Sequence, residues 1–326
     1  RSQILLLSKT ANNIRGPKMI KTVLITGANS GLGRETARQF ATIESTELVY
    51  LACRNRQKAE LAKNSLEEAT GRSIFELVEL DTSDMNSARA AVDSIDRPVE
   101  GLVMNAGGIV GKNFAERTAD GVTRMLAVNL LGHVVMLDGL LKQQKLTKAA
   151  LFSGSETARG VPMLGLRKPR LNSYSVDEFE SVCNGTFFQG KMNFMVAYQY
   201  VKFLGALYMG SMARRYPGLR LMTVSPGSTS GTDIYNNAPL STKIVMKIIS
   251  FLPLKSLREG SFHSVEEGAK RYVDVLNDEV YKTGVFYASE QSLLTGPMVD
   301  QGAFFADLRN ELYQDTAYEA LHRFIS

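Results

Sequence analysis

A glycine-rich turn near the start of the chain constrains the fold more than any other segment. It follows an apolar run at residues 22–26 and reads Thr26-Gly27-Ala28-Asn29-Ser30-Gly31-Leu32-Gly33. Glycine tolerates tight turns and close backbone approaches, so this spacing lets a strand pass directly into a helix. The first N–H groups of that helix would face an anion, which predicts a phosphate cradle. A turn that binds nothing is the alternative, but its place between strand and helix favours the cradle.

A tyrosine and a lysine spaced by one helical turn form the second informative pattern, Tyr198-x-x-x-Lys202. Residues i and i+4 of a helix share a face, so the ammonium can lie beside the phenol. A tyrosine that exchanges protons near neutral pH needs its pKa lowered from ~10 by about three units, or roughly 4 kcal/mol. A Lys⁺ at about 4 Å, under an effective dielectric of about 20, supplies about that much. A pair on a helix surface is the alternative, and the cradle upstream favours the functional interpretation.

Short apolar runs alternate with helix-length amphipathic segments along most of the chain. Strands are predicted at residues 22–26, 47–52, 74–80, 99–104, 149–153, 219–224 and 285–288. Helices are predicted at residues 33–41, 57–69, 83–95, 120–141 and 194–215, and Ser264-Val265-Glu266-Glu267 is predicted to be a capping box that starts another. This pattern predicts an α/β fold: a single doubly wound Rossmann-type domain over residues 21–326, with a seven-stranded, mostly parallel sheet and helices on both faces.

The bulk composition excludes several classes of protein. With 326 residues, 44% of them hydrophobic, the chain can bury a large core. The net charge is +5 and the pI about 9.1, but no run of like charges comparable to a nucleic-acid-binding arm is present, so no nucleic-acid partner is expected. Cys53 and Cys183 are too few for a disulfide framework and fit a reducing compartment. The three histidines are isolated, so no metal site is expected.

Three segments depart from the regular alternation. Residues 1–20 contain basic but no acidic side chains, as a leader or a targeting remnant would, so the cytoplasm or the interior of a plastid or mitochondrion is expected. Residues 157–195, rich in glycine and proline, are expected to be a functional insertion. Residues 228–262 are expected to cover the substrate; within them, residues 239–257 form a basic amphipathic pattern that also fits a membrane-surface contact or plain packing. No apolar run reaches the roughly 18–20 residues of a membrane span.

The end of the second predicted strand carries the signal for cofactor choice. A site selective for NAD usually places a carboxylate there, whereas this chain has Arg54 and no acidic residue before Glu60. A guanidinium can bind a 2′-phosphate through two hydrogen bonds, so Arg54 predicts NADP, with a solvated loop charge as the alternative. Asp81, after the third strand, is expected either to accept from the adenine amino group or to cap a helix.

Taken in order, these motifs resemble the classical short-chain dehydrogenase/reductase family. The matching residues are Thr26-Gly27-x-x-x-Gly31-x-Gly33, Asn105-Ala106-Gly107, Asn129, Ser155, Tyr198-x-x-x-Lys202 and Pro226-Gly227. The resemblance runs from about residue 21 to residue 288, and it implies a Rossmann-type sheet, a nicotinamide cofactor and an Asn-Ser-Tyr-Lys tetrad. It makes Tyr198 the proton donor or acceptor, and Lys202 its activator and a ribose ligand.

The same resemblance implies roles for the other motif residues. Ser155 would anchor the substrate oxygen, and Asn129 would hold a water of a proton relay. Asn105, Ala106 and Gly107 would line the cofactor, and Pro226, Gly227 and Thr229 would bind it near the nicotinamide. Ser153 competes with Ser155, which is preferred because Ser153 should still belong to the strand.

The long interval between Ser155 and Tyr198, together with segments such as Asn129-Leu130-Leu131-Gly132-His133, is similar to light-dependent protochlorophyllide reductases and retinol-dehydrogenase-like proteins. The expected function is NADP-dependent hydride transfer between NADPH and a bulky apolar carbonyl or enone, with Tyr198 as proton donor. A catalytically silent NADP-binding sensor or scaffold subunit is the alternative. The expected partner is a small hydrophobic molecule, while peripheral membrane contact and homo-oligomerisation are left open.

Overall fold

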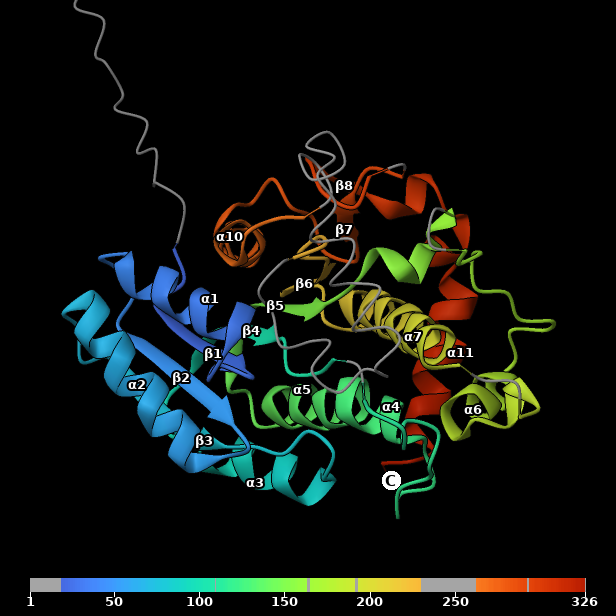
Figure 1. The fold of residues 1–326 in the computed structure, drawn as a ribbon, viewed down its shortest axis with the longest axis horizontal. Coiled ribbons are helices and arrows are strands. Elements are labelled where there is room, and N and C mark those ends of the chain that lie inside the picture. Colours follow the sequence, from blue (N-terminus) through green and yellow to red (C-terminus); the bar gives the residue numbers. More distant parts are fainter. Residues whose placement is uncertain are drawn as a thin grey trace, which may run out of the picture.

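The fold is built on one sheet, and a computed structural model describes it at residues 19–108, 110–162, 165–190, 193–229, 262–291 and 293–325. The strands are β1 (Thr22–Thr26), β2 (Leu48–Cys53), β3 (Phe75–Glu79), β4 (Val99–Met104), β5 (Leu146–Ser153), β6 (Arg220–Val224), β7 (Phe286–Ser289) and β8 (Met298–Asp300). Their order is β3-β2-β1-β4-β5-β6-β7-β8, with every pair parallel except β7–β8 (Figure 1). The strand order reverses between β1 and β4, which creates a crevice at their carboxyl ends.

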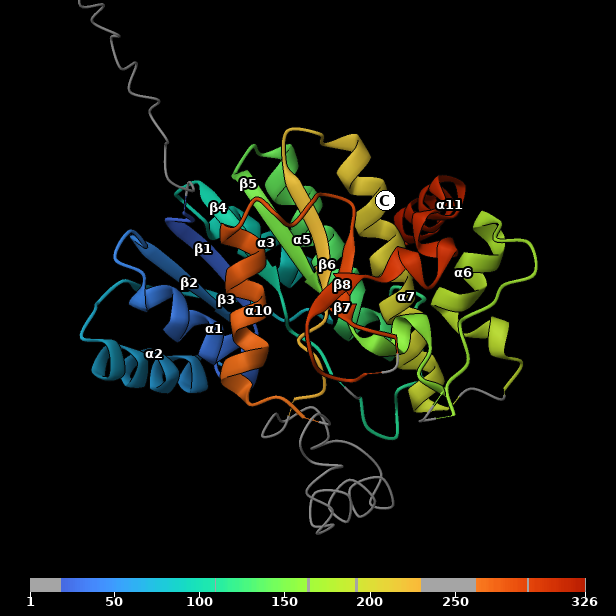
Figure 2. The same cartoon turned by 90° about the horizontal axis from the view of Figure 1, so that it is seen from above.

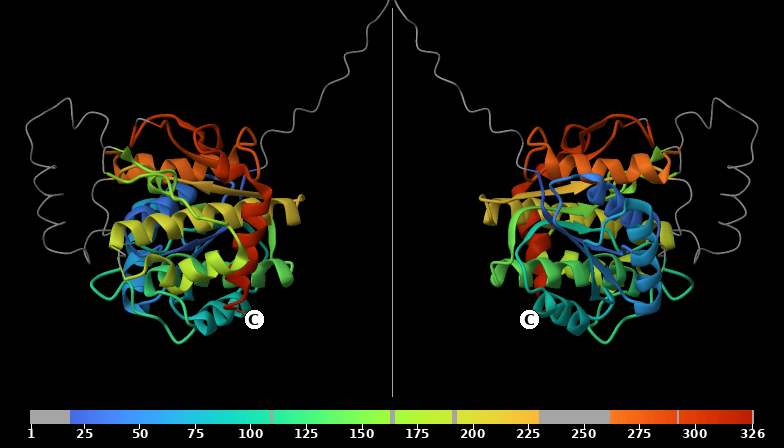
Figure 3. Two further views of the ribbon diagram at one scale, coloured as in Figure 1. Left: turned by 90° about the vertical axis from the view of Figure 1, so that its right-hand side faces the viewer. Right: turned by 90° about the vertical axis from the view of Figure 1, so that its left-hand side faces the viewer.

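Helices cover both faces of this sheet (Figure 2). One face carries α1 (Gly31–Thr42), α2 (Arg56–Thr70) and α10 (Val265–Asn277), and the other carries α3 (Met85–Ser94), α5 (Gly132–Lys142) and α7 (Phe194–Arg215). Shorter helices are α4 (Arg124–Leu126), α6 (Val176–Asn184), the π-helical turn η1 (Ala127–Leu131), and the 3-10 turns η2 (Glu156–Arg159), η4 (Thr186–Phe188), η6 (Gln301–Ala303) and η7 (Ala306–Arg309). The last helix, α11 (Glu311–His322), packs across α7, on the opposite side of β6 from α10 (Figure 3).

The strand sequences are apolar at consecutive positions because both faces of the sheet are covered. In β1, Val23 and Ile25 pack in the core beneath α1 and α10, and Leu24 packs in the core beneath α3 and α5. All three are fully buried. Helix starts are fixed by side-chain caps: Asn55, Ser175 and Asn193 cap α2, α6 and α7. The capping box predicted at Ser264 and Glu267 is confirmed at the start of α10.

The mostly parallel sheet between two helical layers is confirmed, and all seven predicted strands are present. The prediction lacks β8, a three-residue strand that pairs antiparallel with β7. The helix predicted at residues 120–141 begins at Arg124 and is interrupted by η1. Residues 157–195 contain most of η2, all of α6 and η4, and the first residues of α7. The amphipathic pattern at 239–257 and residues 1–18 lie outside the described residues.

The expectation that no segment is long and apolar enough to span a membrane needs correction. Among the described residues, the helical run Arg124–Lys142 is long and apolar enough to cross a membrane by length and composition. However, 78% of its 18-residue apolar window is buried inside the protein, since it packs against the sheet beside α3 and α7. The run is therefore accounted for as a core helix.

Candidate active site

A cavity of about 760 Å³ opens at the carboxyl ends of the strands. Its walls come from the loops that follow β1 to β6 and from α7, which are far apart in the sequence. It is lined by most of the predicted site residues: Gly27, Asn29, Ser30, Gly31, Leu32, Arg54, Asp81, Asn105, Ala106, Gly107, Ser155, Tyr198, Lys202, Pro226, Gly227 and Thr229. Thr26, Gly33 and Asn129 do not line it.

The turn between β1 and α1 has the geometry of an anion cradle. Gly27 and Gly31 have φ angles of 67° and 50°, in the left-handed region that favours glycine. A Cβ on Gly33 would lie 2.3 Å from the carbonyl oxygen of Gly27. Ser30 stands at the N-cap of α1 without a side-chain cap hydrogen bond. The turn therefore presents the N-terminus of α1 to the cavity.

Thr26 acts behind the cavity wall. Its hydroxyl oxygen accepts hydrogen bonds from the backbone N–H groups of Asn105 and Ala106, each at 2.8 Å. The side-chain Nδ2 atom of Asn105 donates in turn to the Thr26 carbonyl at 3.0 Å. Thr26 thus fixes the loop after β4 against the end of β1, next to the cradle.

Arg54 and Asp81 face one another at the ends of β2 and β3. The Arg54 Nη1 atom lies 3.6 Å from Asp81 Oδ2, and the arginine side chain is 71% exposed. Asp81 Oδ1 accepts hydrogen bonds from the Ser83 N–H and hydroxyl. The residue that caps α3 is Asp84, so Asp81 is not the helix cap that the sequence allowed. Arg54 and Asp81 both line the cavity.

Tyr198 and Lys202 lie one turn apart on α7 and are 8% and 3% exposed. The Lys202 Nζ atom lies 5.3 Å from the centre of the Tyr198 ring and 4.8 Å from that of Phe152. It donates a hydrogen bond of 2.7 Å to the Ser153 carbonyl. Burial lowers the pKa of Lys202 to about 7. This opposes the full ammonium charge that the sequence argument assumed, because desolvation disfavours the charged form.

The two candidate serines have different surroundings. Ser153 ends β5, and its hydroxyl shares a 2.6 Å hydrogen bond with the Tyr272 hydroxyl. The Ser155 hydroxyl oxygen accepts from the N–H and the hydroxyl of Thr157, at 3.3 and 3.0 Å. Both serines line the cavity. Ser153 is tied to the helix behind the sheet, whereas Ser155 bonds within its own loop.

Asn129 lies in η1 and is fully buried. Its Oδ1 atom accepts from the Gly108 N–H, and its Nδ2 atom donates to the carbonyls of Gly108 and Met125. A Cβ on Gly107 would lie 2.5 Å from Asn129 Oδ1. The side chain therefore holds the loop after β4 and lies outside the cavity wall.

Sequence reasoning missed Glu156 and Arg271, a buried charged pair beside this cavity. Glu156 follows Ser155 and lines the cavity, and Arg271 lies behind it on α10. Both are almost fully buried. The only signal was the position of Glu156 next to a candidate serine. Among the described residues, no group of three His, Cys, Asp or Glu side chains could hold a metal ion.

Comparisons with known proteins agree with this geometry. The family model described as short chain dehydrogenase matches residues 21–151. The short chain dehydrogenase sor7 of Hypocrea jecorina (strain QM6a) is 29% identical over 82% of this chain and 73% of its own length. Human retinol dehydrogenase 11 is 30% identical over 64% of this chain and 61% of its own length. Chloroplastic protochlorophyllide reductase of Marchantia paleacea is 25% identical over 89% of this chain and 64% of its own length. This chain thus spans less than two thirds of the latter two relatives.

Solved structures share the fold. The short-chain dehydrogenase/reductase (glucose/ribitol dehydrogenase) of Brucella melitensis superposes with a TM-score of 0.60 at 19% identity, covering 86% of this chain and 100% of its own. The short chain dehydrogenase of Burkholderia cenocepacia J2315 in complex with NADP has a TM-score of 0.57 at 20% identity, covering 82% and 94%. The L-sorbose reductase of Gluconobacter frateurii, complexed with NADPH and L-sorbose, has a TM-score of 0.60 at 19% identity, covering 86% and 99%.

The strand order and the glycine turn at the β1/β4 crevice define a Rossmann-type α/β protein. The buried tyrosine–lysine pair opens into the same crevice. The family model over residues 21–151 and the curated relatives narrow this class: the chain is similar to the short-chain dehydrogenase/reductase family of oxidoreductases.

Proposed function

We propose that this protein is an NADP-dependent reductase that transfers a hydride between NADPH and a bulky apolar carbonyl or enone, with Tyr198 as proton donor. One observation carries the proposal: a single cavity joins the glycine cradle, Arg54 and the Tyr198–Lys202 pair. A cradle alone would support binding, and a buried phenol beside an amine alone would support proton exchange. Because they share one cavity, the cradle and the tyrosine–lysine pair can act on a cofactor and a substrate bound side by side.

The residues present fit a dinucleotide. The cradle at Gly27 to Gly33 allows a close approach of a pyrophosphate, because its glycines permit the tight turn that brings the N-terminus of α1 to the cavity. Asn105, Ala106 and Gly107 would line the cofactor, and Pro226, Gly227 and Thr229 would hold its nicotinamide end. Asp81 would accept from the adenine amino group. When bound, a reduced nicotinamide supplies the hydride for the reaction.

The chain's own residues would manage the proton. Tyr198 would give its hydroxyl proton to the substrate oxygen, which Ser155 would hold by a hydrogen bond. Lys202 would stabilise the phenolate left behind. Its pKa of about 7 makes the charge on Lys202 sensitive to its surroundings, and a polyanionic cofactor in the cavity would favour the ammonium form. Asn129 would act as a positioning residue, because its side chain holds the loop after β4 through Gly108.

Arg54 supports the choice of NADP. Its side chain is exposed at the end of β2 with only a loose contact to Asp81, so it can turn onto a 2′-phosphate. Solved structures that share the fold hold NADP or NADPH. We expect Arg54→Asp to remove most of the preference for NADPH over NADH, because the carboxylate repels the 2′-phosphate. Fluorescence titration with NADPH and with NADH measures this preference. An unchanged ratio of the two dissociation constants would refute the assignment of NADP as the cofactor.

The substrate class rests on the apolar side chains of the cavity. Val110, Val161, Met195 and Leu294 line it, which favours an apolar substrate. The names of two relatives, retinol dehydrogenase and protochlorophyllide reductase, are consistent with a large apolar substrate.

The proton-donor role has a direct test. Tyr198→Phe should abolish reduction of apolar aldehydes while leaving the NADPH dissociation constant within about threefold of wild type, since the substitution removes the hydroxyl group but keeps the ring. Tyr200→Phe is the matched control, because Tyr200 is equally buried on α7 and its hydroxyl bonds to the Arg170 backbone. Turnover by Tyr198→Phe would remove the proposed role. NADPH binding without turnover by the wild type on any carbonyl or enone would favour a silent binding protein.

A further inference from the structure

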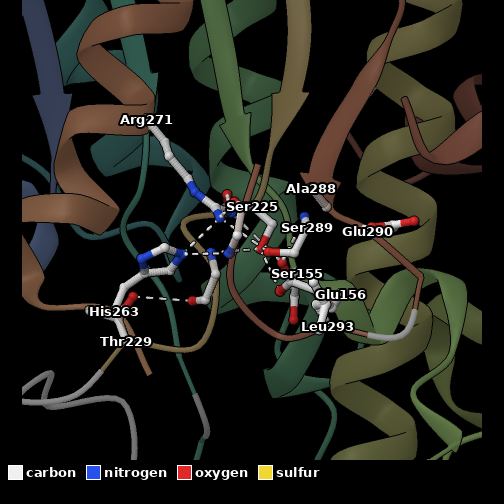
Figure 4. Close-up of polar contacts among 12 residues, drawn as sticks. Ser155, Glu156, Ser225, Thr229, His263, Arg271, Ala288, Ser289, Glu290 and Leu293 are labelled. Atoms are coloured by element: carbon white, nitrogen blue, oxygen red, sulfur yellow. Dashed lines mark hydrogen bonds and ion pairs between the residues drawn. The ribbon is translucent and has the colours of Figure 1, made fainter. Parts of the chain in front are cut away.

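A buried network of polar side chains joins the loops at the reaction end of the cavity (Figure 4). At its centre, Arg271 Nη1 lies 3.9 Å from Glu156 Oε1, and both side chains are more than nine-tenths buried. Glu156 Oε2 accepts a 2.6 Å hydrogen bond from the Ser225 hydroxyl, and Oε1 accepts from the Ser289 N–H at 3.3 Å. The carboxylate from the loop after β5 is thus bonded to residues at the ends of β6 and β7.

Arg271 reaches the same loops from behind the sheet. Its Nη1 donates to the Ser225 carbonyl at 3.0 Å. Its Nη2 donates to the Ser289 hydroxyl at 3.1 Å and to the Gly296 carbonyl at 2.5 Å. One guanidinium on α10 therefore fixes the loops after β6 and β7 relative to one another. Its planar fork suits this task, because the directions of its donors are fixed.

His263 extends the network to the far end of the β6 loop. Its Nε2 accepts a 2.8 Å hydrogen bond from Arg271 Nη2, as expected of a neutral imidazole. Its backbone N–H donates to the Ser228 carbonyl at 2.6 Å, and it forms a parallel bridge with Thr229. A Cβ on Gly227 would lie 2.4 Å from His263 Cδ2, so the ring packs directly on that glycine. Residues 225–229 are held from both sides.

These held residues form a wall of the cavity. Ser225, Pro226, Gly227, Ser228 and Thr229 all line it, as do Glu156 and Leu294. The Ser228 N–H donates to the Leu294 carbonyl at 2.8 Å, which ties the loop after β7 to the same wall. The position of this wall therefore sets the space that the cavity leaves between Tyr198 and residues 225–229.

The residue types are informative because packing alone does not require them. A buried ion pair is often no more stabilising than apolar residues of the same volume, since both charges lose their hydration. Its hydrogen bonds have fixed geometry, so the pair also fixes the relative positions of the groups that it binds. We propose that Glu156, Arg271 and His263 form a polar frame that positions residues 225–229 at the reaction end of the cavity, which makes Arg271 and His263 positioning residues for the proposed reaction. The expected effect on the kinetics rests on the proposed function. The expected effect on the ordering of residues 225–229 does not.

The test uses a double variant that removes both charges together. Glu156→Gln with Arg271→Met removes one buried charge of each sign, so the net buried charge is unchanged and the fold is expected to survive, while the donors to Ser225, Gly296 and His263 are lost. Lys270→Met is the matched control, because Lys270 is the neighbouring residue on α10 and pairs with Asp274 at the surface. Amide hydrogen exchange over residues 225–229 and steady-state kinetics with NADPH and nonanal are the two readouts.

In the double variant, we expect exchange over residues 225–229 to be about tenfold faster. We also expect the KM for nonanal to rise about tenfold while the NADPH dissociation constant, governed mainly by the cradle, stays within about threefold. Arg271→Lys should give intermediate values, because one ammonium reaches fewer of the acceptors, and it replaces the double variant if that does not fold. Exchange and KM indistinguishable from Lys270→Met would overturn the inference. Faster exchange in a protein whose wild type reduces no carbonyl would overturn the proposed function and leave the frame standing.

Discussion

Two glycines of the cradle are required by their backbone conformation, and a third by lack of space. Gly27 and Gly31 have positive φ angles, where a side chain strains the backbone. Gly33 lies inside α1, but its Cβ would stand 2.3 Å from the Gly27 carbonyl oxygen and 2.8 Å from Asn105 Nδ2. A backbone atom blocks the space, so a methyl group there must open the turn.

Gly33→Ala should therefore weaken NADPH binding by at least about tenfold and lower the free energy of unfolding by about 1–3 kcal/mol, as overpacked sites do. Fluorescence titration and urea unfolding measure the two effects. Gly218→Ala is the control, because a Cβ there meets nothing within 4 Å. Equal dissociation constants for the two variants would show that the turn does not bind the cofactor's phosphates.

His133 contributes a pH dependence to stability. Burial, with the nearby positive charge of Lys202, lowers its pKa from 6.5 to about 3, and its Nε2 lies 3.0 Å from the Thr26 hydroxyl. Below pH 6.5, the unfolded chain binds a proton there that the folded chain does not. The stability associated with neutral His133 is therefore complete above pH 6.5 and is lost as the pH falls, by roughly 2 kcal/mol at pH 5. His133→Gln should reduce the stability loss between pH 7.5 and pH 5 by about that amount in urea unfolding.

His322 provides a control of opposite sign. Despite its burial, which acts to lower it, the pKa of His322 is raised, because the Asp138 carboxylate and the Tyr318 carbonyl accept its N–H groups. Its stabilisation is complete below its unfolded pKa and is lost as the pH rises through the folded one. His322→Gln should therefore enlarge the acid loss of stability. The same direction of change in both histidine variants would contradict the assignment of their charge states.

At the scale of elements, the start of α5 must lie unusually close to the loop after β3. A Cβ on Gly132 would lie 2.2 Å from the Thr82 carbonyl oxygen. The Thr82 hydroxyl donates to the Val128 carbonyl within η1 at 2.9 Å, and Thr82 also lines the cavity. The π-helical turn, α5 and the adenine side of the crevice are thus joined at one close contact.

Gly132→Ala should cost about 1–3 kcal/mol of unfolding free energy, because the methyl group meets backbone atoms. Gly139→Ala, on the same helix, should be neutral or slightly stabilising, since the atoms nearest to its Cβ, at 3.2 Å, belong to the Val92 side chain rather than to backbone, and alanine favours helices by about 0.5–1 kcal/mol. Urea unfolding of both variants decides the matter. Equal stabilities would mean that α5 can move away from Thr82 at little cost.

The elements that the sequence predicts are those whose local pattern and tertiary environment agree. Buried parallel strands such as β1 and β2 are continuous apolar runs, so they are visible without the fold. β8 is not, because its three residues are only partly buried and exist as a strand through pairing with β7. α11 shows no strong apolar stripe, since small residues such as Ala317 and Ala320 make its buried face.

The same distinction holds for the candidate site. The cradle and the Tyr198–Lys202 pair are local motifs, and the structure gathers both around one cavity. The Glu156–Arg271 contact joins residues more than 100 positions apart, and nothing near Arg271 distinguishes it from an exposed helix cation such as Lys270. Long-range packing alone decides which of the two is buried.

At the scale of the whole molecule, α11 completes the core on the far side of α7. Most of α7 is buried, which requires cover on the face that points away from the sheet. α11 supplies that cover with Ala317, Ala320 and Leu321, while α6 packs against the same core. The apolar, nearly all-round burial of α7 therefore depends on the last helix of the chain.

Leu321→Ala should lower the free energy of unfolding by about 2–5 kcal/mol, because it leaves a cavity between α11 and α7. Leu312→Ala is the matched control on the same helix: its side chain is 66% exposed, so its loss should change stability by less than about 0.5 kcal/mol. Urea unfolding measures both, and exchange of the α7 amides reports whether the cover opens locally. If Leu321→Ala were as stable as Leu312→Ala, α11 would be an appendage, and the core that positions Tyr198 and Lys202 would be complete without it.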